Sequence, residues 1–299
     1  MAHRTLSVPS DTGVSTDLDA HVRKFLPRGS KLVKSHTYGT AAWTRASRII
    51  VSLEDGMEKS YFLKCASEDV GKLMLEGEFD LLKKIGEYSP GLAPMLYGTG
   101  QFRDPSTPTY FLLMEFLDMD TGAPEPVAFM KQLAELHTRG VSPTGQFGYG
   151  MTTCQGPIVQ DITWDDNWSA VYGRMMRQFH DREMATNGPS KDGKYEAEME
   201  KLILLQFRIY LETGQAKIYD PAGFYAHNEY EFGMWRSENV PFGRPYYRQY
   251  FRYIPPSEPK EQWDDRNKLY SIKFEVTCSA LWSAVHEGQH KMYYAPIPS

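Results

Sequence analysis

The first third of the chain alternates between apolar, strand-like runs and short turn signals. Residues 31–34 open a strand pattern, 48–53 form a β-branched run and 61–66 begin with two aromatic residues, and such residues favour strands. The small and hydroxyl residues at 35–42 predict a loop between the first two runs, and Glu-Asp-Gly at 54–56 predicts a hairpin turn. The pattern therefore predicts a β-rich region.

Helical spacing of apolar residues occurs before this region and after it. Leu18, Val22 and Phe25 follow an i, i+4, i+7 pattern, which predicts a short amphipathic helix after a loose polar tail at 1–13. A longer helix is predicted over 70–88. Further helices are predicted at 129–137, from Trp168 onwards, at 196–205 and at 264–284.

One strand-like run interrupts these helices and marks a domain boundary. Residues 110–117 are apolar, and the acidic, Gly/Pro-rich stretch 118–126 follows them. We therefore expect a smaller domain over 14–117 and a larger, mainly helical domain over 118–299. The run's end is interpreted as a hinge, or as a plain strand that leaves its sheet.

Composition excludes several classes of protein. The 299 residues are 41% hydrophobic, with a net charge of -5 and a pI of about 5.9, so a nucleic-acid partner is not favoured. No apolar run approaches the length that spans a membrane, and no signal peptide is evident. The three cysteines lack metal-ligand spacing, so we expect reduced thiols in a cytoplasmic protein. Oligomeric state has no sequence signal here.

Lys64 and Glu78 are charged residues at positions where apolar residues are expected. Lys64 lies inside an apolar strand, and Glu78 lies on the apolar stripe of the helix 70–88, with Met74 and Leu82 four residues away on either side. A carboxylate directed at a core requires a cation, and Lys64 is the nearest candidate. Strand alternation offers the alternative that Lys64 faces solvent.

Residues 217–219 predict a short apolar strand, and Asp220 lies at its end. Pro221 then ends the strand because proline has no amide hydrogen. A carboxylate left at a strand end suits a metal or catalytic role, and an ordinary aspartate turn is the alternative.

The order of these features resembles the two-lobed protein-kinase-like fold, and several segments resemble the fructosamine-3-kinase (ketosamine-3-kinase) family. The similarity is to its protein-ribulosamine-3-kinase-like, fungal branch. It is carried by Tyr61-Phe62-Leu63-Lys64, Glu76-Gly77-Glu78, Gly148-Tyr149, Trp164-Asp165-Asp166-Asn167-Trp168 and the stretch from Tyr219 to Glu231. It implies an α+β fold of the aminoglycoside-phosphotransferase type, with a small β-rich N-lobe and a larger, mainly helical C-lobe.

The resemblance also implies an activity, its cofactors and its site residues. The family transfers phosphate from ATP, with Mg²⁺, to the 3-hydroxyl of ribulosamine or fructosamine on protein lysines, which leads to deglycation. By position, Lys64 would hold the α- and β-phosphates and Glu78 would hold Lys64. The remaining implied residues are Gly39 and Thr40 near the phosphates, the backbone of Glu115 and Leu117 for adenine, Asp220 for Mg²⁺, and His227, Glu229, Glu231 and Trp282 toward the substrate.

One segment of the family pattern is missing. The family carries His-Gly-Asp-Leu-Trp-x-x-Asn before the metal-binding aspartate, whereas here residues 205–214 run directly to the strand before Asp220, and neither His-Gly-Asp nor His-Arg-Asp occurs. Loss of a positioned general base costs about 10²–10⁴ in rate, so we expect severely impaired catalysis. The chain is therefore interpreted either as a pseudokinase that acts as a scaffold or binding module, or as a splice or gene-model product that lacks a stretch which its gene encodes. The sequence does not specify which ketosamine or other small molecule is used.

A second motif points to a remote alternative. His286-Glu287-Gly288-Gln289-His290 matches the His-Glu-x-x-His pattern of zinc metallohydrolases. Gly288 weakens a helix by about 1 kcal/mol, and no third ligand follows in the sequence.

Overall fold

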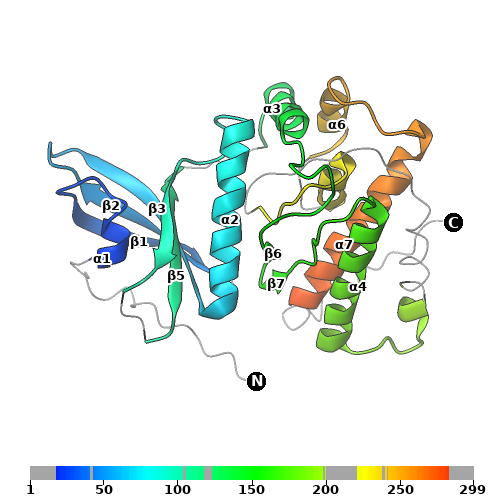
Figure 1. Ribbon diagram of the computed structural model, residues 1–299, viewed down its shortest axis with the longest axis horizontal. Helices are drawn as coiled ribbons and strands as arrows, with labels where there is room; N and C mark the ends of the chain where they lie inside the picture. The colour runs from blue at the N-terminus through cyan, green and yellow to red at the C-terminus, as the bar shows by residue number, and fades with distance from the viewer. Residues whose placement is uncertain are drawn as a thin grey trace. The chain divides into compact units, whose positions relative to one another are not determined.

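The computed structural model describes residues 18–40, 43–103, 106–117, 123–197, 199, 221–237, 240 and 242–282 (Figure 1). The chain forms two compact units. Unit 1 comprises residues 1–79 and 94–119, and unit 2 comprises residues 80–93 and 120–299. The predicted tail at 1–13 lies outside the described residues.

Unit 1 contains a five-stranded antiparallel sheet with the order β1-β2-β3-β5-β4. Its strands are β1 (Lys31–Thr40), β2 (Arg45–Ser52), β3 (Glu58–Ser67), β4 (Leu96–Gln101) and β5 (Thr109–Glu115). The prediction of a loop over 35–42 was wrong for 35–40, because cross-strand pairing with β2 continues through Gly39–Ala46 and Thr40–Arg45. Strand β4 was not predicted, because its sequence Leu-Tyr-Gly-Thr-Gly-Gln contains two glycines, a residue type depleted in strands.

A hydrophobic core cluster of unit 1 lies on one face of this sheet. Successive strand residues point to opposite faces, so Tyr61 and Leu63 of β3 share a face while Lys64 points to the other. The buried residues of this core are Val22 of helix α1 (Ala20–Arg23), Ile49, Val51, Tyr61, Leu63, Phe111 and Leu113. The alternation therefore explains how a lysine fits inside an apolar strand.

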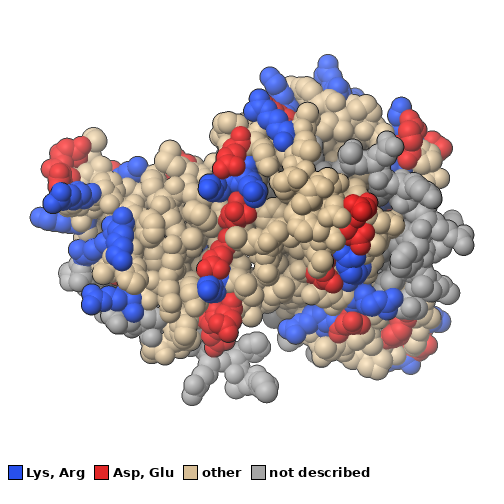
Figure 2. Space-filling model, viewed as in Figure 1, with Lys and Arg blue, Asp and Glu red and all other residues tan. Residues whose placement is uncertain are grey.

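Helix α2 (Glu68–Tyr88) begins directly after β3. A Cβ at Gly71 would lie 2.7 Å from the backbone carbon of Ala66, so a residue other than glycine would push the first turn away from the strand. Acidic and basic side chains are intermixed on the surface where α2 runs (Figure 2). The exposed charged residues of this helix are Glu68, Asp69, Lys72, Glu76, Lys83 and Glu87.

Unit 2 is mainly helical. Its elements are α3 (Pro126–Arg139), β6 (Cys154–Gln155), β7 (Ile158–Val159), α4 (Trp168–Asn187), η2 (Asn228–Arg236), α6 (Arg244–Tyr250), η3 (Lys260–Gln262) and α7 (Trp263–Trp282). Helix α4 begins at Trp168 because the side chain of Asn167 accepts a hydrogen bond from the Ser169 amide at 2.9 Å. Both α4 and η2 pack against α7, and α3 packs against α6 (Figure 1).

The region 233–262 corrects a second expectation. Its Tyr, Arg and Pro content suggested irregular surface structure, but Phe232, Trp235, Tyr246 and Tyr250 form a buried aromatic cluster against α3. Aromatic rings bury large apolar areas, so this cluster contributes a core of its own to unit 2.

Among the helices of the described residues, none is both long and apolar enough to span a bilayer. Much of the predicted helix at 196–205 lies outside the described residues.

Candidate functional site

Lys64 of β3 and Glu78 of α2 form an ion pair in unit 1. The Lys64 ammonium lies 2.7 Å from Oε2 of Glu78, and the two side chains are only 12% and 10% exposed. Taking charges out of water is unfavourable unless they are paired, so each group stabilises the other's placement. The ion pair therefore fixes the direction of the Lys64 ammonium, which lies on the face of the sheet opposite the unit 1 core.

The same face carries an aromatic group that the sequence analysis missed. Tyr38 packs edge-on against Phe62 and Phe116, with ring centroids 5.9 and 4.9 Å away. The guanidinium of Arg48 lies 4.3 Å from the Phe116 centroid. Phe62 lies two residues before Lys64, so strand alternation places both side chains on one face. The two-residue spacing of Phe62 and Lys64 could have predicted this shared face from the sequence.

The predicted hinge residues lie at the end of β5. The Glu115 amide donates to the Met95 carbonyl at 2.8 Å, and its carboxylate accepts from the Met95 amide at 3.2 Å. The amide of Glu115 is therefore engaged within unit 1. Leu117 follows β5, and its side chain is 40% exposed. Gly39 and Thr40 are the last two residues of β1.

Asp220 lies outside the described residues, so its expected convergence with Lys64 and Glu78 stays a prediction. The chain that follows it is described from Pro221 onwards. Tyr225 and Gly148 exchange both backbone hydrogen bonds at 2.9 Å. Gly148 has φ +125°, and a Cβ there would lie 2.6 Å from the Ile162 carbonyl oxygen, so this close pairing requires glycine.

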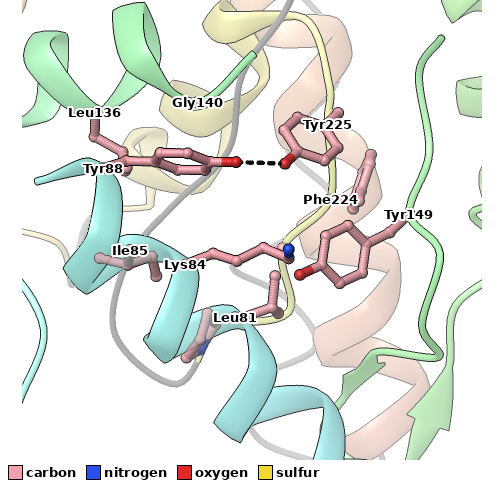
Figure 3. Close-up of a pocket in the computed structure, with 11 residues that line it drawn as sticks. Leu81, Lys84, Ile85, Tyr88, Leu136, Gly140, Tyr149, Phe224 and Tyr225 are labelled. Atoms are coloured by element: carbon pink, nitrogen blue, oxygen red, sulfur yellow. Dashed lines mark hydrogen bonds between the residues drawn. The ribbon is translucent and has the colours of Figure 1, made fainter. Parts of the chain in front are cut away.

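Tyrosine hydroxyls form hydrogen bonds that join Tyr225 and Tyr149 to the C-terminal half of α2. The hydroxyls of Tyr88 and Tyr225 lie 3.0 Å apart (Figure 3). Tyr149 donates a short hydrogen bond to the carboxylate of Asp80. Burial, followed by the bond to Asp80, raises the pKa of Tyr149, so it stays a protonated donor.

These side chains border a small cavity of unit 2 with a volume of about 30 Å³. Its lining includes Leu81, Lys84, Leu136, Phe224 and Tyr225. A space of this size holds about one water molecule. We therefore assign the cavity no ligand.

His227 lies deep in unit 2. Nδ1 is 2.9 Å from the Tyr270 hydroxyl and Nε2 is 2.8 Å from the Ser257 hydroxyl. Burial, with Arg266 nearby, lowers the pKa of His227 to about 3, so the imidazole is neutral at physiological pH. Both ring nitrogens are engaged within the protein, which gives His227 a structural role, and its expected contact with the substrate stays a prediction.

Glu229 is fully buried as well. Its two carboxylate oxygens lie 2.7 and 3.0 Å from nitrogens of Arg266, and the Ser257 amide donates to Oε1 at 2.7 Å. This bidentate, hydrogen-bonded pair joins η2 to α7, so Glu229 also has a structural role, and its expected place near the substrate stays a prediction. Glu231 of η2 is half-buried. Trp282 is the last residue of α7, and its side chain is not described.

Within the described ranges, no group of three or more His, Cys, Asp or Glu side chains is arranged to hold a metal ion. Asp220, His286 and His290 lie outside those ranges. A carboxylate oxygen suits Mg²⁺ chemically, but the described residues give that site no geometry.

Comparison with protein families gives one assignment. The family model described as fructosamine kinase matches residues 32–206 and 207–293, two segments that meet between Gln206 and Phe207. This boundary falls within the stretch where the sequence analysis places the missing His-Gly-Asp segment.

Two plant proteins, each called protein-ribulosamine 3-kinase, chloroplastic, are similar in sequence. The protein from Arabidopsis thaliana is 26% identical over 230 residues, which cover 71% of this chain and 68% of that protein. The protein from Oryza sativa subsp. indica is 29% identical over 235 residues. That match covers 71% of this chain and 65% of the rice protein, slightly less than two thirds of its length.

Solved structures show the same fold. A "putative fructosamine-3-kinase" from Thermobifida fusca YX-ER1 superposes with a TM-score of 0.69 at 20% identity, over 90% of this chain and 94% of that one. One from Haemophilus somnus 129PT gives 0.67 at 16% identity, over 85% and 86%. A thermostable mutant of aminoglycoside phosphotransferase APH(4)-Ia gives 0.53 at 13% identity, over 85% of this chain and 88% of that one. The predicted α+β, protein-kinase-like fold of the aminoglycoside-phosphotransferase type is confirmed.

Proposed function

Because this chain belongs to the fructosamine kinase family, we propose that it binds ATP for phosphoryl transfer to the 3-hydroxyl of a ketosamine, and that its own catalytic rate is severely reduced. The ion pair between Lys64 and Glu78 carries the nucleotide part of this proposal. Kinases use a strand lysine held by a helix glutamate to bind ATP phosphates. The plant relatives, named as ribulosamine 3-kinases, support the ketosamine part.

Each part of the site then has a task. Lys64 donates to the α- and β-phosphates, and Glu78 keeps the ammonium in place while it does so. The aromatic group of Tyr38, Phe62 and Phe116 offers ring faces near the adenine, beside the backbone at Leu117. Asp220 would hold Mg²⁺, which neutralises phosphate charge during transfer.

The reduced rate follows from what the sequence lacks. No His-Gly-Asp occurs in the 299 residues, so the aspartate that the family uses to accept the substrate hydroxyl's proton has no counterpart. Such a base contributes about 10²–10⁴ in rate. The boundary between the two matched segments supports a missing stretch between Gln206 and Phe207.

Phosphorus NMR tests the activity. The chain, and a variant with the family's His-Gly-Asp-Leu-Trp-x-x-Asn stretch inserted after Gln206, are incubated with Mg-ATP and a ribulosamine or fructosamine. We expect a sugar 3-phosphate from the inserted variant and about 10²–10⁴ less from the chain as it stands. Absence of product from a folded inserted variant would defeat the activity.

The missing stretch also favours a second candidate, a non-catalytic scaffold or binding module. Stabilisation by ATP separates the two, because a ligand at 100 times its Kd adds about 2.7 kcal/mol to the free energy of unfolding. Unfolding that does not change with ATP, with or without Mg²⁺, favours the scaffold.

A further inference from the structure

Arg48 of β2 lies beside the aromatic group of Tyr38, Phe62 and Phe116. Its guanidinium lies 4.3 Å from the centroid of the Phe116 ring, and its Nε donates a hydrogen bond to the Ser60 hydroxyl at 3.1 Å. The ring contact comes from the residue that follows β5, and the hydrogen bond comes from β3. Two neighbours on different strands therefore fix the direction of this guanidinium.

The donors at the tip of this guanidinium are unused within the described part of the chain. Neither Nη1 nor Nη2 of Arg48 forms a hydrogen bond or an ion pair with any described residue. Arginine carries its N–H donors in a planar fork, and the side chain here is half-buried. A fixed fork with free donors is suited to a ligand that presents two acceptor atoms side by side.

Strand pairing places Arg48 on the same face of the sheet as Lys64. Arg48 lies directly opposite Phe62 in the antiparallel pair of β2 and β3, and opposite residues point to the same face. Phe62 precedes Lys64 by two residues, which is about 7 Å along a strand. Phe116, which Arg48 contacts, directly precedes Leu117 at the predicted hinge. Arg48 therefore lies on the base side of the proposed nucleotide site and Lys64 on its phosphate side.

The two common purine bases differ at the edge that such a fork can read. Guanine presents two adjacent acceptors, O6 and N7, whereas adenine presents the acceptor N7 beside the amino group N6, which is a donor. A guanidinium has donors only, so it forms two hydrogen bonds with guanine but meets a donor when it faces adenine. Aromatic rings stack on either base, so the rings alone give little preference.

We propose that Arg48 is a specificity-determining residue of the proposed nucleotide site and that it favours a 6-oxopurine triphosphate such as GTP over ATP. This inference rests on the proposed nucleotide binding and adds a base preference to it. The rings of Tyr38, Phe62 and Phe116 stack on the base, and Arg48 donates to its O6 and N7. A bidentate arginine contact of this kind discriminates between bases by about 5- to 150-fold.

Three substitutions separate recognition of the base from support of the fold. Arg48→Met keeps an unbranched side chain against Phe116 and removes every donor. Arg48→Lys keeps the charge and loses the planar fork, so it should not restore bidentate binding. Arg45→Met is the matched control, because Arg45 is also half-buried on β2 and, three residues away, points to the opposite face of the sheet.

Calorimetric titrations with GTP, ITP, ATP and inorganic tripolyphosphate provide the readout. ITP shares O6 and N7 with GTP but lacks its 2-amino group, and tripolyphosphate has no base. The unsubstituted chain should bind GTP and ITP at least about fivefold more tightly than ATP. Arg48→Met and Arg48→Lys should lose this preference, while their affinities for ATP and tripolyphosphate stay nearly unchanged. Arg45→Met should keep the preference.

An equal loss of affinity for GTP, ITP and ATP in Arg48→Met would overturn the inference, because Arg48 would then only support the aromatic group. Binding of GTP to the unsubstituted chain that is no tighter than binding of ATP would overturn it as well. In both cases the proposed function stands, because ATP still binds. If the unsubstituted chain binds none of the three nucleotides, the proposed function and the inference both fail.

Discussion

The Lys64 ammonium and the Glu78 carboxylate meet at 2.7 Å across 14 residues of sequence, one on strand β3 and the other on helix α2. Residues 63 and 65 pack toward the core on the other face of the sheet, and Glu78 shares its face of α2 with the buried Leu75 and Leu82. Strand β3 and helix α2 therefore each fix one partner of this ion pair, unlike two mobile side chains that meet on a surface.

A double-mutant cycle measures this pair. Lys64→Met and Glu78→Gln should each lower the free energy of unfolding, and their coupling energy should be about 1–3 kcal/mol because both side chains are largely buried. The exposed pair Lys72–Glu76, 3.9 Å apart on the same helix, is the control and should give no more than about 0.5 kcal/mol. Equal coupling energies in denaturant unfolding would show that Lys64 and Glu78 act as ordinary surface charges.

Removing Arg266 should destabilise unit 2 strongly. Arg266→Met leaves the fully buried carboxylate of Glu229 without its cation, and breaking such a pair costs about 3–5 kcal/mol. Lys260→Met, which removes the partner of the exposed Glu258, should leave the free energy of unfolding nearly unchanged, because water and salt screen this pair. Urea unfolding of both variants checks this, and a small loss from Arg266→Met would contradict the structural role given to Glu229.

The contact between Tyr88 and Tyr225 should behave as one hydrogen bond. Tyr88→Phe and Tyr225→Phe should each cost about 1 kcal/mol, and the double variant should cost about as much as either single one. Thermal unfolding of the three variants measures this, with Tyr253→Phe at an exposed position as the control. Costs that add up would mean that the two hydroxyls have separate partners.

Acid should destabilise the protein through His227. Its pKa falls from 6.5 to about 3 on folding, so between these pH values His227 binds a proton in the unfolded chain but not in the folded protein. The contribution of His227 is therefore complete above about pH 6.5 and is lost toward pH 3, at up to about 1.4 kcal/mol per pH unit.

His227→Gln removes this titration and keeps a polar amide in the cavity. Between pH 6.5 and 4.5 the unsubstituted protein should lose about 2 kcal/mol more stability than the variant. His36→Gln in β1 is the matched control. Parallel stability curves for the unsubstituted protein and His227→Gln would show that His227 titrates in the folded state.

The features that the sequence predicted are those with a local signal. The position of Lys64 was predicted from a strand pattern, and the position of Glu78 was predicted from the apolar stripe of a helix. A carboxylate on an apolar stripe requires a nearby cation, which predicted the ion pair. The bonds of Tyr225 with Gly148, Arg266 with Glu229, and Lys273 with Gln160 join residues 37 to 113 positions apart. No periodicity in the sequence marks such pairs.

The prediction of irregular surface structure over 233–262 was wrong for a related reason. Tyrosine and tryptophan carry polar atoms, so their composition is compatible with surface loops, and only the folded arrangement shows Trp235 and Tyr250 buried against α3. The family resemblance, and no local pattern, placed His227 and Glu229 toward the substrate, and this stays a prediction. The fold buries both side chains and bonds them to Tyr270 and Arg266, contacts that no periodicity in the sequence marks.

Calorimetric titration with ATP tests the central claim most directly. The unsubstituted chain should bind ATP, Lys64→Met should weaken the affinity at least about tenfold through loss of a phosphate-bound ammonium, and Lys72→Met should bind as the unsubstituted chain does. Equal affinities for the unsubstituted chain and Lys64→Met, or no heat of binding from the unsubstituted chain, would contradict the assignment of Lys64 and Glu78 to a nucleotide site.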